Sequence, residues 1–234
     1  MIHSFYLRKT LKKLKAVVFD LDDTLYPEKE FVLSGFRAVA AWAELNLGID
    51  SNLGERQLIS YYENGIRGDT FNRWLASHNL LSDDLVKEMI KIYREHIPSI
   101  SPFPEVKEVL GELKKKFLLG IVSDGYIEVQ RKKLNALEIE NFFDAVVFSD
   151  EWGKKNWKPS SKPFEIVSEE LGVPSNQCIY VADNPLKDFF GAKHVGIYTI
   201  RIIRQGGEYS NCKPPSIEYS PDLTITSIEE LLNI

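Results

Sequence analysis

A short apolar run near the start of the sequence ends abruptly in acids, within the stretch from Val17 to Tyr26. Residues 15–19 suit a buried parallel strand and are too few for a buried helix. Three acids, Asp20, Asp22 and Asp23, follow at once. In an open α/β sheet, ligands bind just beyond the carboxyl ends of the strands, so acids at this point indicate a functional site.

Asp20 and Asp22 are separated by one residue, and in a turn that leaves a strand both can point toward one small volume. Two carboxylates held that close repel each other, and a divalent cation is the usual remedy. Asp20 then suits a nucleophile or metal ligand, and Asp22 an acid/base that protonates a leaving group and later activates water. Thr24 is expected to fix the turn through a side-chain hydrogen bond to the backbone. The alternative is an ordinary polar turn in which Asp23 is solvated.

The composition is that of an ordinary globular protein. The 234 residues, 44% of them hydrophobic, suffice for one large domain or for a core domain with a smaller insert. A formal net charge of -5 offers no general attraction to nucleic acid or to an anionic membrane. A basic cluster at the start is interpreted as a solvated run; it comprises Arg8, Lys9, Lys12, Lys13 and Lys15.

No segment is long and apolar enough to span a membrane, and the N-terminus lacks the apolar stretch of a signal peptide. A cytoplasmic protein is therefore expected. Cys178 and Cys212 are the only cysteines and do not form a C-x-x-C pair, so neither a disulfide framework nor a zinc site is indicated.

After Pro27 the pattern turns helical and stays so as far as a proline-rich return at Pro98, Pro102 and Pro104. Gly48 is placed to end the first helix and Ser82 to cap the last. Four helices are expected, at residues 28–47, 53–63, 70–78 and 82–96. A block of helices without a strand predicts a small helical domain, residues 27–103, inserted after the first strand.

From Glu105 the pattern alternates between helix and strand, which is typical of a parallel sheet with crossover helices. Strands are expected at residues 117–122, 145–148, 177–182 and 196–202. Helices are expected at residues 105–116, 127–137, 163–171 and 186–193. The tail is loop-like as far as residues 223–226 and ends in a short helix. The chain is therefore predicted to be an α/β protein, with a doubly wound parallel sheet in residues 1–26 and 104–234 and an inserted α-helical domain.

Polar groups follow two further predicted strands. Ser123, Asp124 and Gly125 offer a hydroxyl and backbone N–H groups at a helix start, which suit a phosphate oxygen. The alternative for them is a helix N-cap. Asp183 is a candidate metal ligand, with Asp188 in support one helical turn later. The alternative there is an Asx turn with proline at the first helical position.

A lysine is expected near Asp20, because a buried cation offsets carboxylate and phosphate charge. The loop at residues 153–159 offers Lys154, Lys155 and Lys158. Lys158 is preferred since Pro159 restricts the backbone beside it. The other lysines of the region are expected to be solvated.

Taken in order, these residues resemble the four motifs of the haloacid dehalogenase-like hydrolases. The motifs read Asp20-x-Asp22-x-Thr24, then Ser123, then Lys158-Pro159, then Asp183 with Asp188. The match runs from about Val17 to Ile200, and the helical insert lies between the first and second motifs, as in members with a C1-type cap. Each motif alone is weak, but four in order at the expected strand ends are specific.

The resemblance implies a Rossmann-like core with a helical cap, and a magnesium-dependent phosphatase that works through an aspartyl-phosphate. Asp20 would attack phosphorus, and Asp22 would be the acid/base. Ser123 and Lys158 would hold the phosphoryl oxygens. Magnesium would be held by Asp20, the backbone carbonyl of Asp22, Asp183 and, in support, Asp188.

Asp22 distinguishes among members of the family. Dehalogenases and phosphonatases that resemble this core generally lack an acid at that position, so a phosphatase is favoured over both. A sugar-phosphate mutase keeps the acid and is an alternative. Two others, from different classes, are a phosphoacceptor signalling domain and a catalytically idle binding protein. Departures from the family's pattern, Ala182 in place of a common glycine and a longer lysine loop with Trp152 and Trp157, bear on subfamily and substrate.

The expected substrate is a small phosphorylated metabolite, such as a sugar phosphate or a nucleotide, and neither nucleic acid nor a membrane is an expected partner. Arg67 lies between Gly65 and Gly68 in a loop of the helical insert and is a candidate contact to an anionic or sugar group. The alternative is a solvated loop charge. The sequence does not indicate the oligomeric state.

Overall fold

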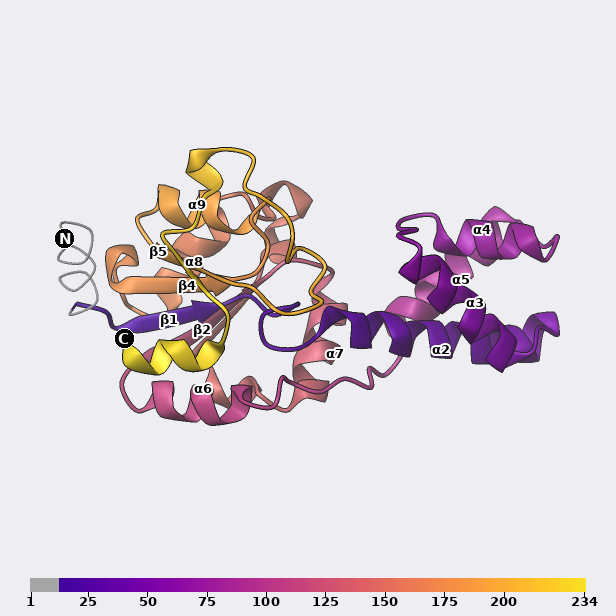
Figure 1. Cartoon of the computed structure of the whole chain (residues 1–234), viewed down its shortest axis with the longest axis horizontal. Coiled ribbons are helices and arrows are strands. Elements are labelled where there is room, and N and C mark those ends of the chain that lie inside the picture. The colour runs from indigo at the N-terminus through magenta and orange to yellow at the C-terminus, as the bar shows by residue number, and fades with distance from the viewer. Residues whose placement is uncertain (1–12) are drawn as a thin grey trace. The chain divides into compact units, whose positions relative to one another are not determined.

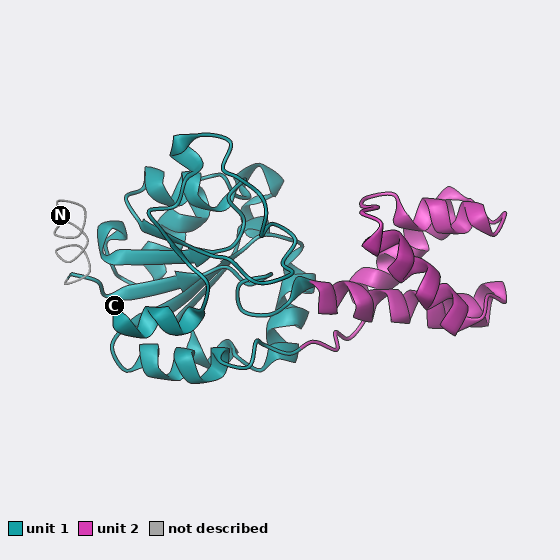
Figure 2. Ribbon diagram, viewed as in Figure 1, with its two compact units in different colours: residues 1–28, 101–234 teal, residues 29–100 magenta. Residues whose placement is uncertain are grey.

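The computed structural model of the chain describes residues 13–234 (Figure 1). Of the predicted basic cluster, Lys13 and Lys15 are exposed, and Arg8, Lys9 and Lys12 lie outside the described residues. The chain divides into two compact units (Figure 2). The sheet unit comprises residues 1–28 and 101–234, and the helical unit comprises residues 29–100.

Six parallel strands form the sheet, in the order β3-β2-β1-β4-β5-β6. The central strand β1 (Ala16–Phe19) pairs with β2 (Leu118–Ser123) on one side and with β4 (Cys178–Ala182) on the other. The outer strands are β3 (Ala145–Phe148), β5 (Tyr198–Ile202) and β6 (Leu223–Ile225). Because the strand order reverses at β1, the carboxyl end of β1 is the point where open sheets bind ligands. The predicted α/β fold with a doubly wound parallel sheet is confirmed.

Apolar side chains of alternate strand positions point to opposite faces of the sheet, and helices cover both faces. On one face, a buried cluster that includes Val18, Val122 and Tyr180 packs with residues of α8 (Lys162–Glu170) and α9 (Asp188–His194). On the other face lies α6 (Val106–Lys114), which contacts β2 and the C-terminal 3₁₀ helix η6 (Ile228–Asn233) (Figure 1). Helix α7 (Ile127–Leu137) follows β2.

One glycine brings a helix close to the predicted lysine loop. A Cβ atom at Gly191 of α9 would lie 2.4 Å from the carbonyl oxygen of Ser160 and 2.6 Å from that of Pro159. The missing side chain therefore lets α9 pack directly against the backbone that follows Lys158. This approach positions the lysine at the end of the sheet.

The helical unit is built from α2 (Glu28–Leu47), α3 (Ser51–Glu63), α4 (Thr70–Ser77) and α5 (Asp83–Glu95). Its buried core includes Phe36, Val39, Leu58, Trp74, Leu75 and Met89. The side chain of Ser82 caps α5, as predicted, by accepting a hydrogen bond from the N–H of Leu85 at 3.3 Å. Among residues 13–234, no helix is long and apolar enough to cross a membrane.

Candidate active site

Lys158 lies at the centre of a buried group of charges at the carboxyl end of the sheet. Its Nζ atom is 2.6 Å from Asp20 Oδ1 and 2.8 Å from Asp188 Oδ1, and it donates a hydrogen bond to the Tyr180 hydroxyl at 2.9 Å. Burial favours the neutral amine, but the two carboxylates hold the pKa of Lys158 well above its usual value. The structure leaves Lys154 and Lys155 exposed, as expected.

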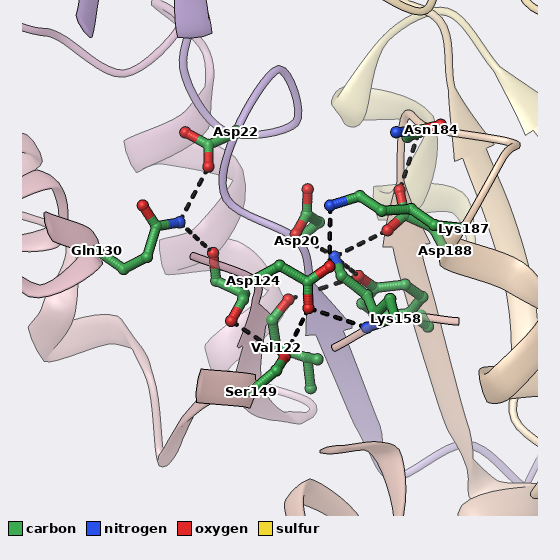
Figure 3. Close-up of polar contacts among 12 residues, drawn as sticks. Asp20, Asp22, Val122, Asp124, Gln130, Ser149, Lys158, Asn184, Lys187 and Asp188 are labelled. Carbon is green, nitrogen blue, oxygen red and sulfur yellow. Dashed lines mark hydrogen bonds and ion pairs between the residues drawn. The ribbon is translucent and has the colours of Figure 1, made fainter. Parts of the chain in front are cut away.

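Three carboxylates gather beside this lysine. Asp20, Asp183 and Asp188 are all buried, and each offers an oxygen within 4.8 Å of the others. Burial raises the pKa of Asp20 to about 7; Lys158 acts against this rise, and Asp188 adds to it. Burial and the charges of Asp188 and Asp20 also hold the pKa of Asp183 well above its usual value. Figure 3 shows Asp20 and Asp188 on either side of the Lys158 amine.

The carboxylate cluster fits a hard divalent cation such as Mg²⁺. All three side chains offer oxygen ligands, which is the donor set that magnesium and calcium prefer. The raised pKa values of Asp20 and Asp183 indicate that one lysine does not offset three buried acids. A divalent cation among them would favour the ionised carboxylates and relieve their repulsion.

Ser123 ends β2, and its hydroxyl faces α7. The Ser123 Oγ atom accepts a hydrogen bond from Gln130 Nε2 at 2.6 Å. Gly125, two residues on, has a φ of +123°, a conformation that favours glycine. The helix that follows begins at Ile127 with Tyr126 at its N-cap. The alternative interpretation of Ser123 and Asp124 as a helix N-cap is therefore wrong.

Asp124 ties three loops together. Its carboxylate accepts hydrogen bonds from the Ser149 hydroxyl at 2.7 Å and from the backbone N–H of Lys158 at 3.1 Å. It also lies 2.9 Å from Lys187 Nζ. Burial raises the pKa of Asp124, but Lys158 and Lys187 outweigh burial and hold it below its usual value. The carboxylate is thus engaged with the protein, and the contact of the Asp124 backbone N–H with a phosphate oxygen stays a prediction.

Asp22 points toward α7, and three donors surround its carboxylate, two from α7 and one from the turn that carries Asp22. Lys133 Nζ lies 2.7 Å from Oδ1, and Gln130 Nε2 donates to Oδ2 at 3.0 Å. The Tyr26 hydroxyl donates to Oδ1 as well. Burial alone would raise the pKa of Asp22, but Lys133 and the donated hydrogen bonds lower it overall. The arrangement therefore favours the carboxylate form.

Asp183 and Asp188 flank a turn that confirms the Asx turn of the sequence-based alternative but not its proline at the first helical position. Asn184 forms an Asx turn, in which its Oδ1 accepts from the N–H of Leu186 at 2.9 Å. Asp188 Oδ2 accepts from the N–H of Asn184 at 2.9 Å. Helix α9 begins at Asp188 rather than at Leu186 as predicted, so Pro185 is not its first residue. The turn leaves the Asp183 carboxylate in the acidic cluster.

Comparison with known proteins adds a family to this geometry. A family model described as haloacid dehalogenase-like hydrolase matches residues 17–202. The chain belongs to the haloacid dehalogenase-like hydrolase family. The predicted resemblance is confirmed.

Three similar proteins show how far this likeness extends. A glyceraldehyde 3-phosphate phosphatase of Methanopyrus kandleri is 33% identical over 230 residues, which cover 94% of this chain and 97% of the relative. One of Methanocaldococcus jannaschii is 32% identical over 236 residues, covering 94% and 96%. The crystal structure of a HAD phosphatase from Thermococcus onnurineus is 26% identical, covers 94% of this chain and 97% of that one, and has a TM-score of 0.61.

In this haloacid dehalogenase-like hydrolase, the C-terminal segment braces the turn that carries Asp20 and Asp22. Asp23, which was expected to be solvated under the alternative interpretation, is 5% exposed and accepts from the N–H groups of Glu28 and Glu208. Arg204 donates to the Thr24 carbonyl at 2.9 Å. Among residues 13–234, the buried Thr24 hydroxyl has no hydrogen-bond partner, so the predicted side-chain bond is not formed. The arginine fixes the turn instead, through the backbone.

Several residues of this hydrolase's site were not predicted, among them Gln130 and Lys133. A signal for both was present, because residues 130, 133, 134 and 137 share one face of a helix, and the last two are leucines. Two polar residues in such an apolar stripe need partners. Tyr180 carried no comparable signal, since an aromatic residue in a buried strand is ordinary core.

The helical unit of this hydrolase contains a cavity of about 320 Å³ between α2, α4 and α5, with Phe36, Tyr93 and Arg67 among its lining residues. The Arg67 guanidinium lies 3.7 Å from the centre of the Tyr62 ring and donates to the Tyr62 carbonyl at 2.6 Å. Arg67 is therefore tied to its own loop. Its contact with a substrate stays a prediction.

Proposed function

We propose that this protein is a magnesium-dependent phosphatase that hydrolyses a small phosphomonoester through an aspartyl-phosphate on Asp20. The observation that carries the proposal is the pairing of Asp20 with Lys158 at 2.6 Å inside a cluster of acids suited to a divalent cation. A second acid, Asp22, stands in the same turn and is linked through Gln130 to the Ser123 hydroxyl. Phosphatase names on relatives that cover nearly the whole chain support the same reaction.

In the first step, an oxygen of Asp20 attacks phosphorus, and the bond between phosphorus and the leaving oxygen breaks. Asp22 gives its proton to the leaving oxygen, so that an alcohol departs rather than an alkoxide. Lys158, the Ser123 hydroxyl and the backbone N–H groups of Asp124 and Gly125 hold the phosphoryl oxygens.

In the second step, water attacks the phosphorus of the aspartyl-phosphate and gives a proton to Asp22. The bond between Asp20 and phosphorus breaks, inorganic phosphate leaves, and Asp20 returns as a carboxylate. Asp22 is thus protonated again at the end of the cycle, with a proton taken from the water. The site without substrate favours the Asp22 carboxylate, but the negative charge of a bound substrate's phosphoryl group raises the pKa of Asp22 and so favours the protonated form that the first step needs.

Residues Asp20, Asp183 and the backbone carbonyl of Asp22 would hold magnesium, with Asp188 in support. When bound, the ion screens the negative charges of the nucleophile and of the phosphoryl group. The cluster of buried carboxylates supports this assignment.

The substrate class is a small phosphorylated metabolite, such as a sugar phosphate or a nucleotide. Relatives named for glyceraldehyde 3-phosphate make triose phosphates the first compounds to test. The cytoplasmic location, the absence of nucleic-acid and membrane partners, and the cap role of residues 27–103 stay predictions.

The test is phosphate release from phosphorylated sugars, triose phosphates and nucleotides, with Mg²⁺ or with a chelator, by the wild type and by Asp20→Asn. We expect magnesium-dependent release by the wild type that falls at least about a thousandfold in the variant. Lys155→Met, in an exposed residue of the lysine loop, is the matched control and should retain activity. If the wild type releases no phosphate from any substrate, or if Asp20→Asn retains the activity, the proposal is wrong.

A further inference from the structure

Helix α7 buries two polar residues on the side that also carries its apolar contacts. Gln130 is 1% exposed and Lys133 is 4% exposed, next to the buried Leu134 and Leu137. Burying a lysine is costly unless its ammonium group is paired. These buried side chains therefore require a charged or hydrogen-bonding partner inside the protein.

That partner is Asp22, 111 residues before Lys133 in the sequence. Lys133 Nζ lies 2.7 Å from Asp22 Oδ1. The Gln130 amide donates to Oδ2 at 3.0 Å (Figure 3). The same Gln130 nitrogen lies 2.6 Å from Ser123 Oγ. One helix face thus holds both oxygens of Asp22 and sets their separation from the Ser123 hydroxyl.

We propose that Lys133 and Gln130 are positioning residues that place the acid/base Asp22 at the leaving-group side of the phosphoryl site. The inference rests on the proposed phosphatase function, in which Ser123 holds a phosphoryl oxygen and Asp22 protonates the leaving oxygen. Lys133 fixes the side-chain rotamer of Asp22 through an ion pair. Gln130 fixes its distance from the phosphoryl group, because one amide contacts both Asp22 and Ser123.

This role has a consequence that a purely structural role lacks. Proton donation matters most when the leaving group is an alkoxide, and matters little when it is a stabilised phenolate such as p-nitrophenolate. Misplacing Asp22 therefore slows the cleavage of alkyl phosphates selectively. General damage to the site slows both substrates alike.

The experiment compares kcat/KM for p-nitrophenyl phosphate and for the best alkyl phosphate, because kcat/KM covers the steps up to departure of the leaving group. For Lys133→Met we expect a loss of about 10- to 100-fold with the alkyl phosphate and less than about 3-fold with the aryl phosphate. Asp22→Asn should show the same selectivity with a larger loss. Lys132→Met removes the same charge from the neighbouring, less buried position and should show no selective loss.

Thermal unfolding checks that each variant is folded. If Lys133→Met does not fold, Gln130→Met replaces it in the same comparison of the two substrates. Equal losses with both substrates, no loss with either, or a selective loss in Lys132→Met would overturn the positioning role. Failure of the proposed phosphatase function gives a different result. The wild type would then release no phosphate, or Asp20→Asn would release as much as the wild type.

Discussion

The two units of this chain handle charge in opposite ways. In the helical unit, all of whose residues the structure describes, no charged side chain is buried, and the core is apolar with several aromatic rings. In the sheet unit, buried charges collect at the carboxyl end of the strands; they include Asp20, Lys133, Lys158, Asp183, Asp188, Arg201 and Arg204. Buried charge costs folding free energy unless it is paired. Its accumulation at one end of the sheet therefore indicates a functional site rather than a stabilising core.

Among the substitutions that test this difference between the units, Lys158→Met should have the largest effect on stability and activity. Lys158 is fully buried between Asp20 and Asp188, so its removal leaves uncompensated carboxylates inside the protein. We expect a loss of about 3–5 kcal/mol in the free energy of unfolding, measured by urea titration in the presence of a chelator. Phosphate release should fall at least about a thousandfold. A variant as stable as the exposed control Lys155→Met would show that the buried pairs do not matter.

In the helical unit, stability should depend on the volume of the buried apolar side chains rather than on buried charge. Leu58→Ala removes a fully buried side chain from the core of this unit and should cost about 2–5 kcal/mol in unfolding free energy. Leu53→Ala, on the same helix but 42% exposed, is the control and should cost about 0.5 kcal/mol or less. Equal effects of the two substitutions would contradict the assignment of Leu58 to the core.

Magnesium should stabilise the protein more as the pH rises. The pKa of Asp20 in the folded protein is about 7, above its usual 3.8, so the folded state binds this proton more tightly than the unfolded state. Its contribution to the stability of the metal-free protein is fully present below pH 3.8 and is lost as the pH rises through about 7. Asp183, whose pKa is also raised, adds to the same trend. At high pH the ionised carboxylates lower the stability of the metal-free protein, and a bound Mg²⁺ ion offsets this loss because it favours the ionised forms.

Thermal unfolding with saturating Mg²⁺ or with a chelator, at pH 5 and at pH 8, measures this effect. At about 100 times its dissociation constant, the ion stabilises by about 2.7 kcal/mol. We expect a shift in Tm of several degrees at pH 8 and a smaller one at pH 5, and Asp183→Asn should reduce the shift at pH 8. A shift that is equal at both pH values, or larger at pH 5, would contradict the assignment of the ion to these carboxylates.

The smallest effect should come from an ion pair on the surface of the helical unit. Arg73 Nε lies 2.7 Å from Asp69 Oδ2, but both side chains are about half exposed. Arg73→Met should change the free energy of unfolding by less than about 1 kcal/mol, and salt should reduce even that difference. A cost close to that of Lys158→Met would remove the distinction between the two units.

Much of the fold was predictable because the signals for it are local. The strand that ends at Phe19 is confirmed, and α2 spans Glu28–Leu47 as predicted. Apolar runs bounded by turn residues indicate strands, and apolar residues at three- and four-residue spacing indicate helices. The boundaries differ where a side chain intervenes, as at α9, which starts late because Asn184 forms its own turn.

Most of the candidate site was predictable because its residues closely follow strands, and Lys158 was chosen from its loop because of the proline after it. Asp20, Asp183 and Ser123 stand at strand ends, and parallel strands bring their carboxyl ends to one edge of the sheet. Lys133 and Arg204 lie elsewhere in the sequence and reach the first motif across 111 and 180 residues. No local pattern encodes such a pairing. The same reason explains why the burial of Asp23 and the unmade hydrogen bond of Thr24 were not foreseen.

The sequence by itself determined the family, the order of the strands and helices along the chain, and the identity of the acids that follow β1. These properties depend on residue type and on short spacings, which the chain carries whether or not it is folded. Lys158 was expected near Asp20 from the sequence, and the structure pairs the two. Only the tertiary structure decided that Lys133 pairs with Asp22. The two carboxylates are alike in chemistry and nearly adjacent in the chain. Burial raises the pKa of both, but distant segments surround them with different charges and hydrogen bonds, so that the pKa of Asp22 is lowered overall and that of Asp20 is not.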